Sequence, residues 1–208
     1  AGTVSVASGA FAGNASIRTV SGADVEEIES YAFADCPNLT TFNFPKLNKI
    51  GDYAFYNSTR LTISSNDDAN QLQNVKNIGA YAFYKTAVTE VKIEGGDKVS
   101  VGEGAFAFCF DLATVKIGDN VTIETCAFFN PVLDLTYDKT KTLDYYTRYD
   151  YVVGGTTYGY YRYNFNAGVL SKLTTLEIGN NVTIGNNAFA NSANLTEVTL
   201  GDNVKIGA

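Results

Sequence analysis

The stretch that decides the fold covers residues 112–128 and reads LATVKIGDNVTIETCAF. Its first six residues place apolar side chains at alternate positions, as in a short strand with one buried side. Gly118-Asp119-Asn120 follows, and these residue types tolerate the positive φ angles of a tight turn. The last part leads from Ile123 to Phe128, and predicts a second passage of chain that fills the core with an aromatic ring.

The same pattern returns along the chain, marked by the dipeptide Ala-Phe. Its phenylalanines are separated by 22, 22, 28, 23, 22 and 61 residues, and a valine or isoleucine stands five positions before each of them. One unit of about 22 residues cannot bury its own apolar side, whereas stacked units can, with equivalent residues in columns. The period therefore predicts a solenoid of stacked laps around a phenylalanine column, made of Phe11, Phe33, Phe55, Phe83, Phe106, Phe128 and Phe189.

Two laps, residues 28–39 and 112–128, carry a consensus most clearly. Its positions are Ile28, Ala32, Phe33, Cys36 and Leu39 in one lap, and Leu112, Val115, Ile117, Ile123, Ala127 and Phe128 in the other. These residues resemble the leucine-rich-repeat family and, within it, the BspA-like (treponemal-type) class of bacterial surface proteins, whose pattern is roughly L-x-x-I-x-L…I-G-x-x-A-F-x-x-C. The resemblance covers nearly all of the chain except residues 64–74 and 130–171.

The resemblance implies a right-handed leucine-rich-repeat solenoid over residues 1–208, with about seven to eight repeats. Its strands are short and parallel, and turns or short 3₁₀ segments lie on the convex side. The family also implies an exported or cell-surface protein, often an adhesin that binds host proteins or other cells. One departure is that the Asn/Cys ladder position of other leucine-rich repeats is absent.

The composition excludes several classes of function. The 208 residues carry 22 acidic and 15 basic side chains, a net charge of −7, with no basic cluster, which argues against a nucleic-acid partner. The chain has no histidine, so Ser-His, Cys-His and His-metal sites are impossible. We therefore expect no enzyme, no cofactor and no metal site. No apolar run approaches the ~18 residues of a membrane span, and without an apolar leader we expect a mature chain or a fragment.

The three cysteines are expected to be free. Cys36 and Cys109 occupy the same repeat position, where other laps have Ser58, Thr86 and Ser192. Three laps separate these two cysteines, roughly 14 Å, whereas a disulfide needs Cα atoms within about 7 Å. Cys126 stands at a different repeat position. We expect three buried thiols, and no disulfide framework indicates an oxidising compartment.

Two insertions interrupt the period of about 22 residues. The 28-residue spacing contains a polar, turn-rich segment near residues 64–74, predicted to be a surface loop. Asp67-Asp68 lies within it but lacks the ligand spacing of a calcium loop. The 61-residue spacing is expected to hold a missing or altered repeat together with an insertion near residues 138–165.

The second insertion is rich in tyrosine, with eight of the fourteen tyrosines in residues 145–163. Gly154-Gly155 between two β-prone runs predicts a two-residue hairpin. The expected pairs are Tyr151 with Tyr158, Tyr149 with Tyr160, Arg148 with Tyr161 and Tyr146 with Tyr163. The hairpin either packs one face on the solenoid or forms a recognition loop, since tyrosine is enriched at binding surfaces. The candidate binding residues are Tyr146, Tyr149, Tyr160 and Tyr161.

The outward positions of the predicted strands form a second candidate binding surface. If alternation holds, one polar face contains Thr41, Asn43, Glu90, Lys92, Thr114, Lys116, Thr175, Glu177, Glu197 and Thr199. Threonine is a good strand former, so an ordinary solvated sheet face is one interpretation. The other is the surface with which leucine-rich repeats hold partners.

Two functions remain open at this stage. One is noncatalytic binding or adhesion at a bacterial cell surface, with a host matrix protein, a glycan or another cell as the partner. The alternative is a structural spacer that displays another module within a longer surface protein. Ile206-Gly207 begins a repeat whose phenylalanine does not follow, so we expect either a continuing natural chain or end-to-end self-association through this uncapped edge.

Overall fold

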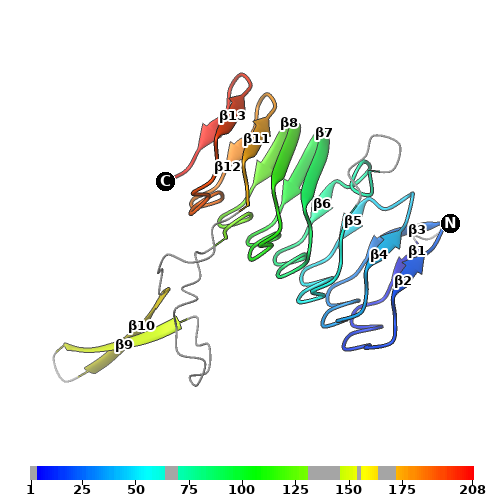
Figure 1. Cartoon of the computed structure of the whole chain (residues 1–208), viewed down its shortest axis with the longest axis horizontal. Helices are drawn as coiled ribbons and strands as arrows, with labels where there is room; N and C mark the ends of the chain where they lie inside the picture. The colour runs from blue at the N-terminus through cyan, green and yellow to red at the C-terminus, as the bar shows by residue number, and fades with distance from the viewer. Residues whose placement is uncertain (1–3, 64–69, 131–145, 154–155, 164–171) are drawn as a thin grey trace. The chain divides into compact units, whose positions relative to one another are not determined.

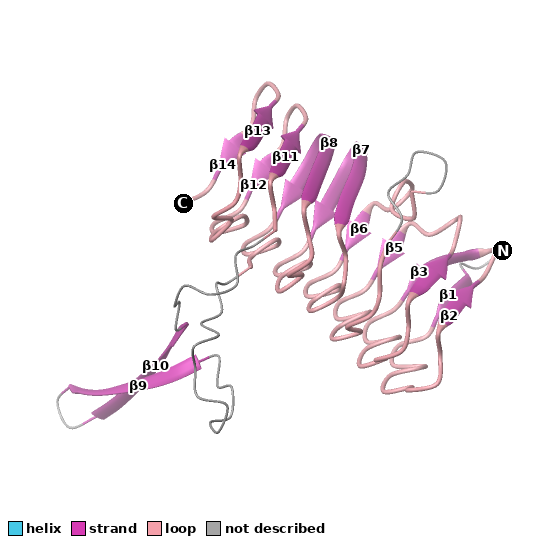
Figure 2. Cartoon of the chain, in the orientation of Figure 1, coloured by secondary structure: helices cyan, strands magenta, loops and turns pink. Residues whose placement is uncertain are grey.

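A computed structural model describes residues 4–63, 70–130, 146–153, 156–163 and 172–208 (Figure 1). The chain divides into two units, one formed by Ala1–Asn130 with Ser171–Ala208 and the other by Pro131–Leu170. The first unit is a solenoid of parallel strands joined by turns. The described residues contain no helix of any kind, so turns, and not 3₁₀ segments, connect the strands (Figure 2).

Each lap of the solenoid carries up to two strands, which we name front and rear. The front strands are β2 (Thr19–Ser21), β4 (Thr41–Asn43), the start of β7 (Glu90–Val101), the start of β8 (Thr114–Ile123), β11 (Thr175–Ile178) and β13 (Glu197–Leu200). The rear strands are β1 (Val4–Val6), β3 (Val25–Ile28), β5 (Lys49–Ile50), β6 (Asn77–Ile78), the ends of β7 and β8, β12 (Thr183–Ile184) and β14 (Lys205–Ile206). All neighbouring strands of this unit pair in parallel, in a ten-stranded sheet and the two-stranded sheet β2–β4.

The predicted phenylalanine column is confirmed, and it forms the centre of the core. All seven rings stack in chain order, with centroids 5.0–5.5 Å apart and planes within 19° of parallel. Each backbone N–H of this column from Phe11 to Phe128 also donates to the alanine carbonyl one lap further, as Phe83 does to Ala105 at 2.7 Å. The Ala-Phe dipeptide therefore supplies both the aromatic contact and the hydrogen bond that join adjacent laps.

The turns that carry these phenylalanines contain two columns of left-handed residues. The residue two before Phe and the residue two after it have φ between 53° and 72° in six of the seven laps. The first column contains Gly9, Tyr31, Tyr53, Tyr81, Gly104, Cys126 and Asn187, and the second contains Gly13, Asp35, Asn57, Lys85, Phe108 and Asn191. Two left-handed residues reverse the chain within six positions, which brings the rear strand back toward the front strand without a helix.

The small-residue position three after Phe forms an internal hydrogen-bond ladder in place of the absent Asn/Cys ladder. Ser58 Oγ donates to the Phe33 carbonyl at 2.8 Å, and Cys109 Sγ donates to the Phe83 carbonyl at 3.1 Å. These two side chains each satisfy a carbonyl of the previous lap, whereas Thr86 Oγ1 donates to the Phe83 carbonyl of its own lap and Ser192 Oγ has no partner among the described residues. All three cysteines are free, as predicted, with Cys36 and Cys109 buried and Cys126 partly exposed.

The 61-residue spacing contains an insertion but no additional lap. β11 pairs directly with β8, joining Thr175 to Thr114, and Phe128 stacks directly on Phe189. The expectation of a missing or altered repeat was therefore wrong, because the laps on either side of residues 131–170 are immediate neighbours.

The second unit contains the predicted antiparallel hairpin, β9 (Tyr146–Val153) with β10 (Thr156–Tyr163). The four expected residue pairs are confirmed by its register, which runs from Val153 paired with Thr156 to Tyr146 paired with Tyr163. Gly154-Gly155 itself lies outside the described residues.

The segment near residues 64–74 is only partly the polar surface loop that we expected. Residues 64–69, which include Asp67-Asp68, lie outside the described part of the chain. Asn70 and Leu72, however, are buried, and Leu72 belongs to the core. The prediction was wrong for this part because Leu72 stands among polar residues in the sequence, although it occupies the core position of its turn.

Candidate functional site

The outward positions of the front strands form aligned rows, as alternation predicted. Strand pairing places Glu90, Thr114, Thr175 and Glu197 in one row, and Lys92, Lys116, Glu177 and Thr199 in the next. The intervening residues of β7, β8 and β11 are buried, whereas their row members are half-buried. Thr41 and Asn43 are likewise exposed on β4, on either side of buried Phe42. All ten predicted positions therefore lie outside the core, and we call their surface the front face.

Charges of both signs lie on the C-terminal half of the front face. Lys116 Nζ lies 3.0 Å from Glu177 Oε1 on the neighbouring strand, and Lys92 Nζ lies 3.0 Å from Glu94 Oε1. Such partly exposed pairs contribute little to stability, with a median of about 0–1 kcal/mol. Their effect is to fix the positions of the charged groups on this face.

A shallow hollow of about 430 Å³ lies among these charges, which we name the charged hollow. Its rim contains five of the ten predicted front-face residues: Lys92, Lys116, Glu177, Glu197 and Thr199. Ile93, Ile117 and Ile178, from three adjacent strands, also line it. The strand pairing thus brings side chains from four distant parts of the sequence into one depression.

A second hollow of about 400 Å³ lies at the N-terminal half of the front face, and we name it the amide hollow. Thr41 and Asn43 line it together with the turn that follows β4 and the turn that precedes β6. The described residues of its lining include five side-chain amides, from Asn43, Asn70, Gln71, Gln73 and Asn74. The sequence analysis missed four of these because they belong to the segment that was expected to be a loop.

A stack of tyrosines on the turns is another surface feature that the sequence analysis missed. Tyr31, Tyr53 and Tyr81 stack at 4.8 and 5.2 Å, and the Tyr81 hydroxyl donates to Glu103 Oε1 at 2.8 Å. Each has a positive φ, which costs a bulky residue about 1–2 kcal/mol, and stacking offsets part of that cost. Burial is the main cause that raises the pKa of Tyr53. Aligning the laps on their phenylalanines would have revealed this column in the sequence.

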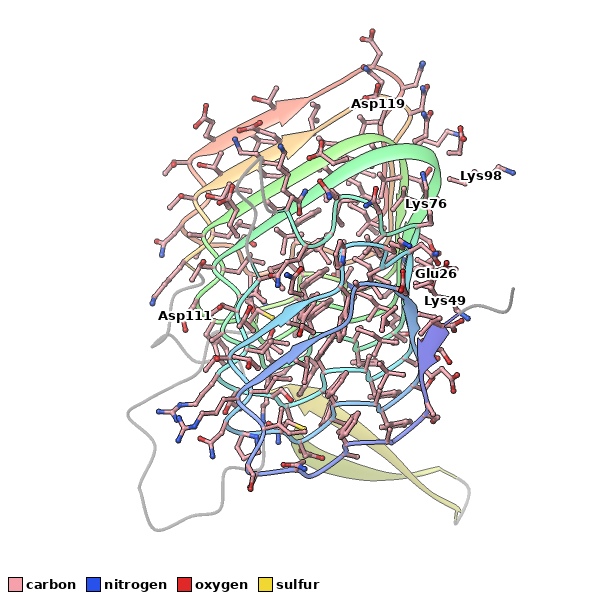
Figure 3. All side chains as sticks on the ribbon, turned by 90° about the vertical axis from the view of Figure 1, so that its right-hand side faces the viewer. Glu26, Lys49, Lys76, Lys98, Asp111 and Asp119 are labelled. Atoms are coloured by element: carbon pink, nitrogen blue, oxygen red, sulfur yellow. The ribbon has the colours of Figure 1, made fainter. Side chains whose placement is uncertain are left out.

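The rear face carries ion pairs between adjacent laps. Lys49 Nζ lies 2.5 Å from Glu27 Oε1, and this hydrogen bond raises the pKa of Lys49. At the corner between the two faces, Lys46 lies 2.7 Å from Asp24, whose pKa is lowered by that bond. Figure 3 shows Lys49 and Lys76 on one side of the solenoid and Asp111 on the opposite side.

The described side chains form no group of three or more cysteine, aspartate or glutamate residues able to hold a metal ion. In the same part of the chain, no helix is long and apolar enough to cross a membrane. Tyr146 and Tyr149 belong to β9, and Tyr160 and Tyr161 belong to β10. The structure describes the backbone of these four candidate tyrosines and not their side chains. Their role remains a prediction.

The lap geometry agrees with a known family pattern. Six copies of the BspA type leucine rich repeat region match residues 4–136 and 161–207. The chain belongs to the BspA-type leucine-rich-repeat family. This BspA-type chain is also similar to the crystal structure of a leucine rich cell surface protein from Faecalibacterium prausnitzii, with 24% identity and a TM-score of 0.46. The similarity covers 88% of this chain and 48% of that one, so the chain spans about half of that protein's length. No curated protein matches the chain in sequence.

Leucine-rich repeats of this kind are in general noncatalytic scaffolds, which agrees with the composition. The front face carries the charged hollow in its C-terminal half and the amide hollow in its N-terminal half.

Proposed function

We propose that this BspA-type protein is a noncatalytic binding protein of a bacterial cell surface, and that its front face holds a protein partner. The observation that carries the proposal is the charged hollow, where strand pairing collects five predicted polar and charged residues from four strands into one depression. Ile93, Ile117 and Ile178 beneath it are almost fully buried, so a partner would meet the polar and charged side chains. Family membership supports the cell-surface location.

The charges favour a protein partner with a complementary pattern. The rim presents the Lys92 and Lys116 ammonium groups beside the Glu177 and Glu197 carboxylates. Mixed charges of this kind select partners through complementarity and faster association more than through raw affinity. Electrostatic steering also falls as salt rises, because the Debye length is only about 8 Å at physiological ionic strength.

The experiment is a binding array of purified extracellular-matrix proteins, probed with the chain and with charge-reversed variants. Lys116→Glu and Glu177→Lys each place two like charges where an ion pair now stands, 3.0 Å apart. We expect each reversal to weaken binding of a matrix protein at least about tenfold, a change of about 1.4 kcal/mol. The double variant Lys116→Glu/Glu177→Lys restores the ion pair in reverse and is expected not to recover binding.

Lys76→Glu is the matched control, since Lys76 is exposed on the other side of the solenoid (Figure 3). Deletion of residues 138–165 tests the alternative that the tyrosine-rich hairpin holds the partner. If charge reversal at Lys116 and Glu177 leaves every interaction unchanged while this deletion abolishes binding, the front face is the wrong surface. If no matrix protein binds at all, the proposed partner class is wrong.

A further inference from the structure

The tyrosine stack on the turns stops at Tyr31 on its N-terminal side. Tyr31 stacks on Tyr53 with the centroids 4.8 Å apart and the rings 3° from parallel, and Tyr53 stacks in turn on Tyr81. In the first lap the same repeat position is Gly9, which has no ring. Among the described residues, Tyr53 is therefore the only ring that contacts Tyr31, and Tyr31 is 47% exposed.

The two glycines that bound this stack differ in the space around them. Gly104 follows Tyr81 in the column, and a Cβ at Gly104 would lie only 2.5 Å from Cε1 of the Tyr81 ring. The Tyr81 ring thus lies against the following lap. A Cβ at Gly9, by contrast, would meet no described atom within 4 Å. The face of Tyr31 that is turned toward the first lap is therefore open, with room for one more planar group.

A carboxylate is fixed beside this open space. Glu29 Oε1 accepts from the Ser5 hydroxyl at 2.8 Å, and Glu29 Oε2 accepts from the N–H of Ser8, the neighbour of Gly9, at 3.0 Å. These two bonds lower the pKa of Glu29, so the group is ionised at neutral pH. A carboxylate has about four acceptor sites, so Glu29 keeps about two of them for a ligand.

The charge around this carboxylate is negative. Lys49 is the cation that acts on Glu29, and its Nζ already contacts Glu27. The bond to Glu27 raises the pKa of Lys49, and the charges of Glu29 and Asp52 raise it further. Three carboxylates thus act on one ammonium group. A cationic ligand gains from this excess of negative charge, whereas an anionic ligand is repelled.

We propose that the open face of Tyr31 binds an arginine side chain of a protein partner. A guanidinium is planar and stacks on aromatic rings, so it fits where a further tyrosine of the column would stand. Its N–H groups match the geometry of a carboxylate, which Glu29 provides. A lysine ammonium lacks the flat face that this space accepts. The site lies on the turns, uses none of the front-face residues and does not rest on the proposed role of the charged hollow.

The test is a titration of the full chain with the peptide acetyl-Gly-Arg-Gly-amide, followed by NMR of the tyrosine rings. The signals of Tyr31 are assigned by their loss in Tyr31→Ala. We expect these signals to shift with a Kd of about 1–10 mM, as suits a single side chain. A peptide with neutral citrulline in place of arginine is expected to bind at least about fivefold more weakly, because it lacks the charge. Glu29→Gln is expected to weaken the arginine peptide by a similar factor.

Gly9→Tyr is the decisive variant, because it extends the stack over the open face. Tyrosine occupies this left-handed position in three other laps, with φ between 55° and 59°, so we expect the variant to fold. Its new ring is expected to block the arginine peptide. Gly13→Tyr is the matched control, since Gly13 also has a positive φ and open space in the same turn but belongs to the other left-handed column. This control is expected to bind as the parent does.

Any of four results would overturn the proposal: no shift of Tyr31 up to about 50 mM peptide, equal binding of the citrulline peptide, parent-like binding by Glu29→Gln, or parent-like binding by Gly9→Tyr. Equal binding of the citrulline peptide would indicate a site for neutral planar groups instead. Circular dichroism of each variant confirms that the solenoid is intact. Lys116→Glu is expected to leave the peptide shift unchanged, so failure of the front-face proposal and failure of this one are read separately.

Discussion

The phenylalanine column predicts that the same substitution has very different effects at its centre and at its end. Phe83 is fully buried, and its ring stacks on Phe55 at 5.2 Å and on Phe106 at 5.0 Å. Phe11 occupies the same repeat position but is 41% exposed and stacks on Phe33 alone, at 5.2 Å. Because each lap contacts only its neighbours, Phe83→Ala removes two interfaces and Phe11→Ala removes one.

The magnitudes follow from burial. Phe83→Ala leaves a cavity between two rings, which costs about 3–5 kcal/mol. Phe11 is a little over half buried, so by area its truncation costs about 1–2 kcal/mol, with one stacking contact included. The expected difference in the free energy of unfolding is therefore about 1–4 kcal/mol, which is at least about fivefold in the unfolding equilibrium constant.

Urea unfolding followed by far-UV circular dichroism measures this difference, provided that the slope m is compared between variants. A smaller m for Phe11→Ala is expected if the first lap opens by itself before the rest. The argument fails if the two variants are equally destabilised, because neighbours on both sides of Phe83 would then contribute nothing beyond those on one side of Phe11.

Three further outcomes follow from the geometry. Burial raises the pKa of Cys109 to about 11, whereas an unfolded thiol ionises near pH 8.5. The stabilising contribution of this thiol is therefore complete below about pH 8 and is lost as the pH rises toward 11. The urea midpoint is expected to fall over this pH range, and to fall less in Cys109→Ser. At pH 8 the folded protein is also expected to leave Cys109 unmodified by Ellman's reagent, and rapid modification would contradict its burial. Gly118→Ala brings a Cβ against the Glu94 carbonyl and is expected to lower the free energy of unfolding by about 3 kcal/mol. Gly9→Ala, in open space at φ 64°, costs only about 1–2 kcal/mol, and equal effects in thermal unfolding would contradict the close stacking at Gly118. Finally, Ile206 is 62% exposed on the last lap, so Ile206→Lys is expected to reduce concentration-dependent self-association in light scattering, whereas a parent chain that stays monomeric at every concentration would refute edge pairing.

The laps were predictable from the sequence because each of them repeats an aliphatic core residue and, five positions later, a phenylalanine. The core positions before and at each phenylalanine recur at fixed offsets, and their burial depends only on neighbours of the same kind, as at Ile50 and Phe55. The front-face rows followed from period-two alternation alone. The register of β9 and β10 was likewise predictable, because a two-residue connection between antiparallel strands fixes which residues pair.

The features that escaped prediction depend on irregularity between laps. The left-handed positions are occupied by residues as different as Gly104 and Tyr81, so no single residue type marks them. The amide hollow is lined by residues from 41–47 and from 70–74, two segments that the repeat pattern does not bring together. Leu72 illustrates the difficulty, because its core position lies in a segment whose length departs from the repeat.

The direction of the interlap hydrogen bonds has a mechanical consequence. The strand bonds, and the turn bonds between equivalent positions such as Phe83 N–H to the Ala105 carbonyl, join one lap to the next along the solenoid axis, whereas other turn bonds, such as Ala54 N–H to the Gly51 carbonyl, stay within a lap. Tension applied to the chain ends therefore peels laps away singly, each opening against its own bonds and one ring contact. A sideways load on the front face must shear whole rows of strands at the same moment. The solenoid is thus expected to unfold gradually when its ends are stretched. Under a load applied across the front face it is expected to fail at a higher force and in a single step.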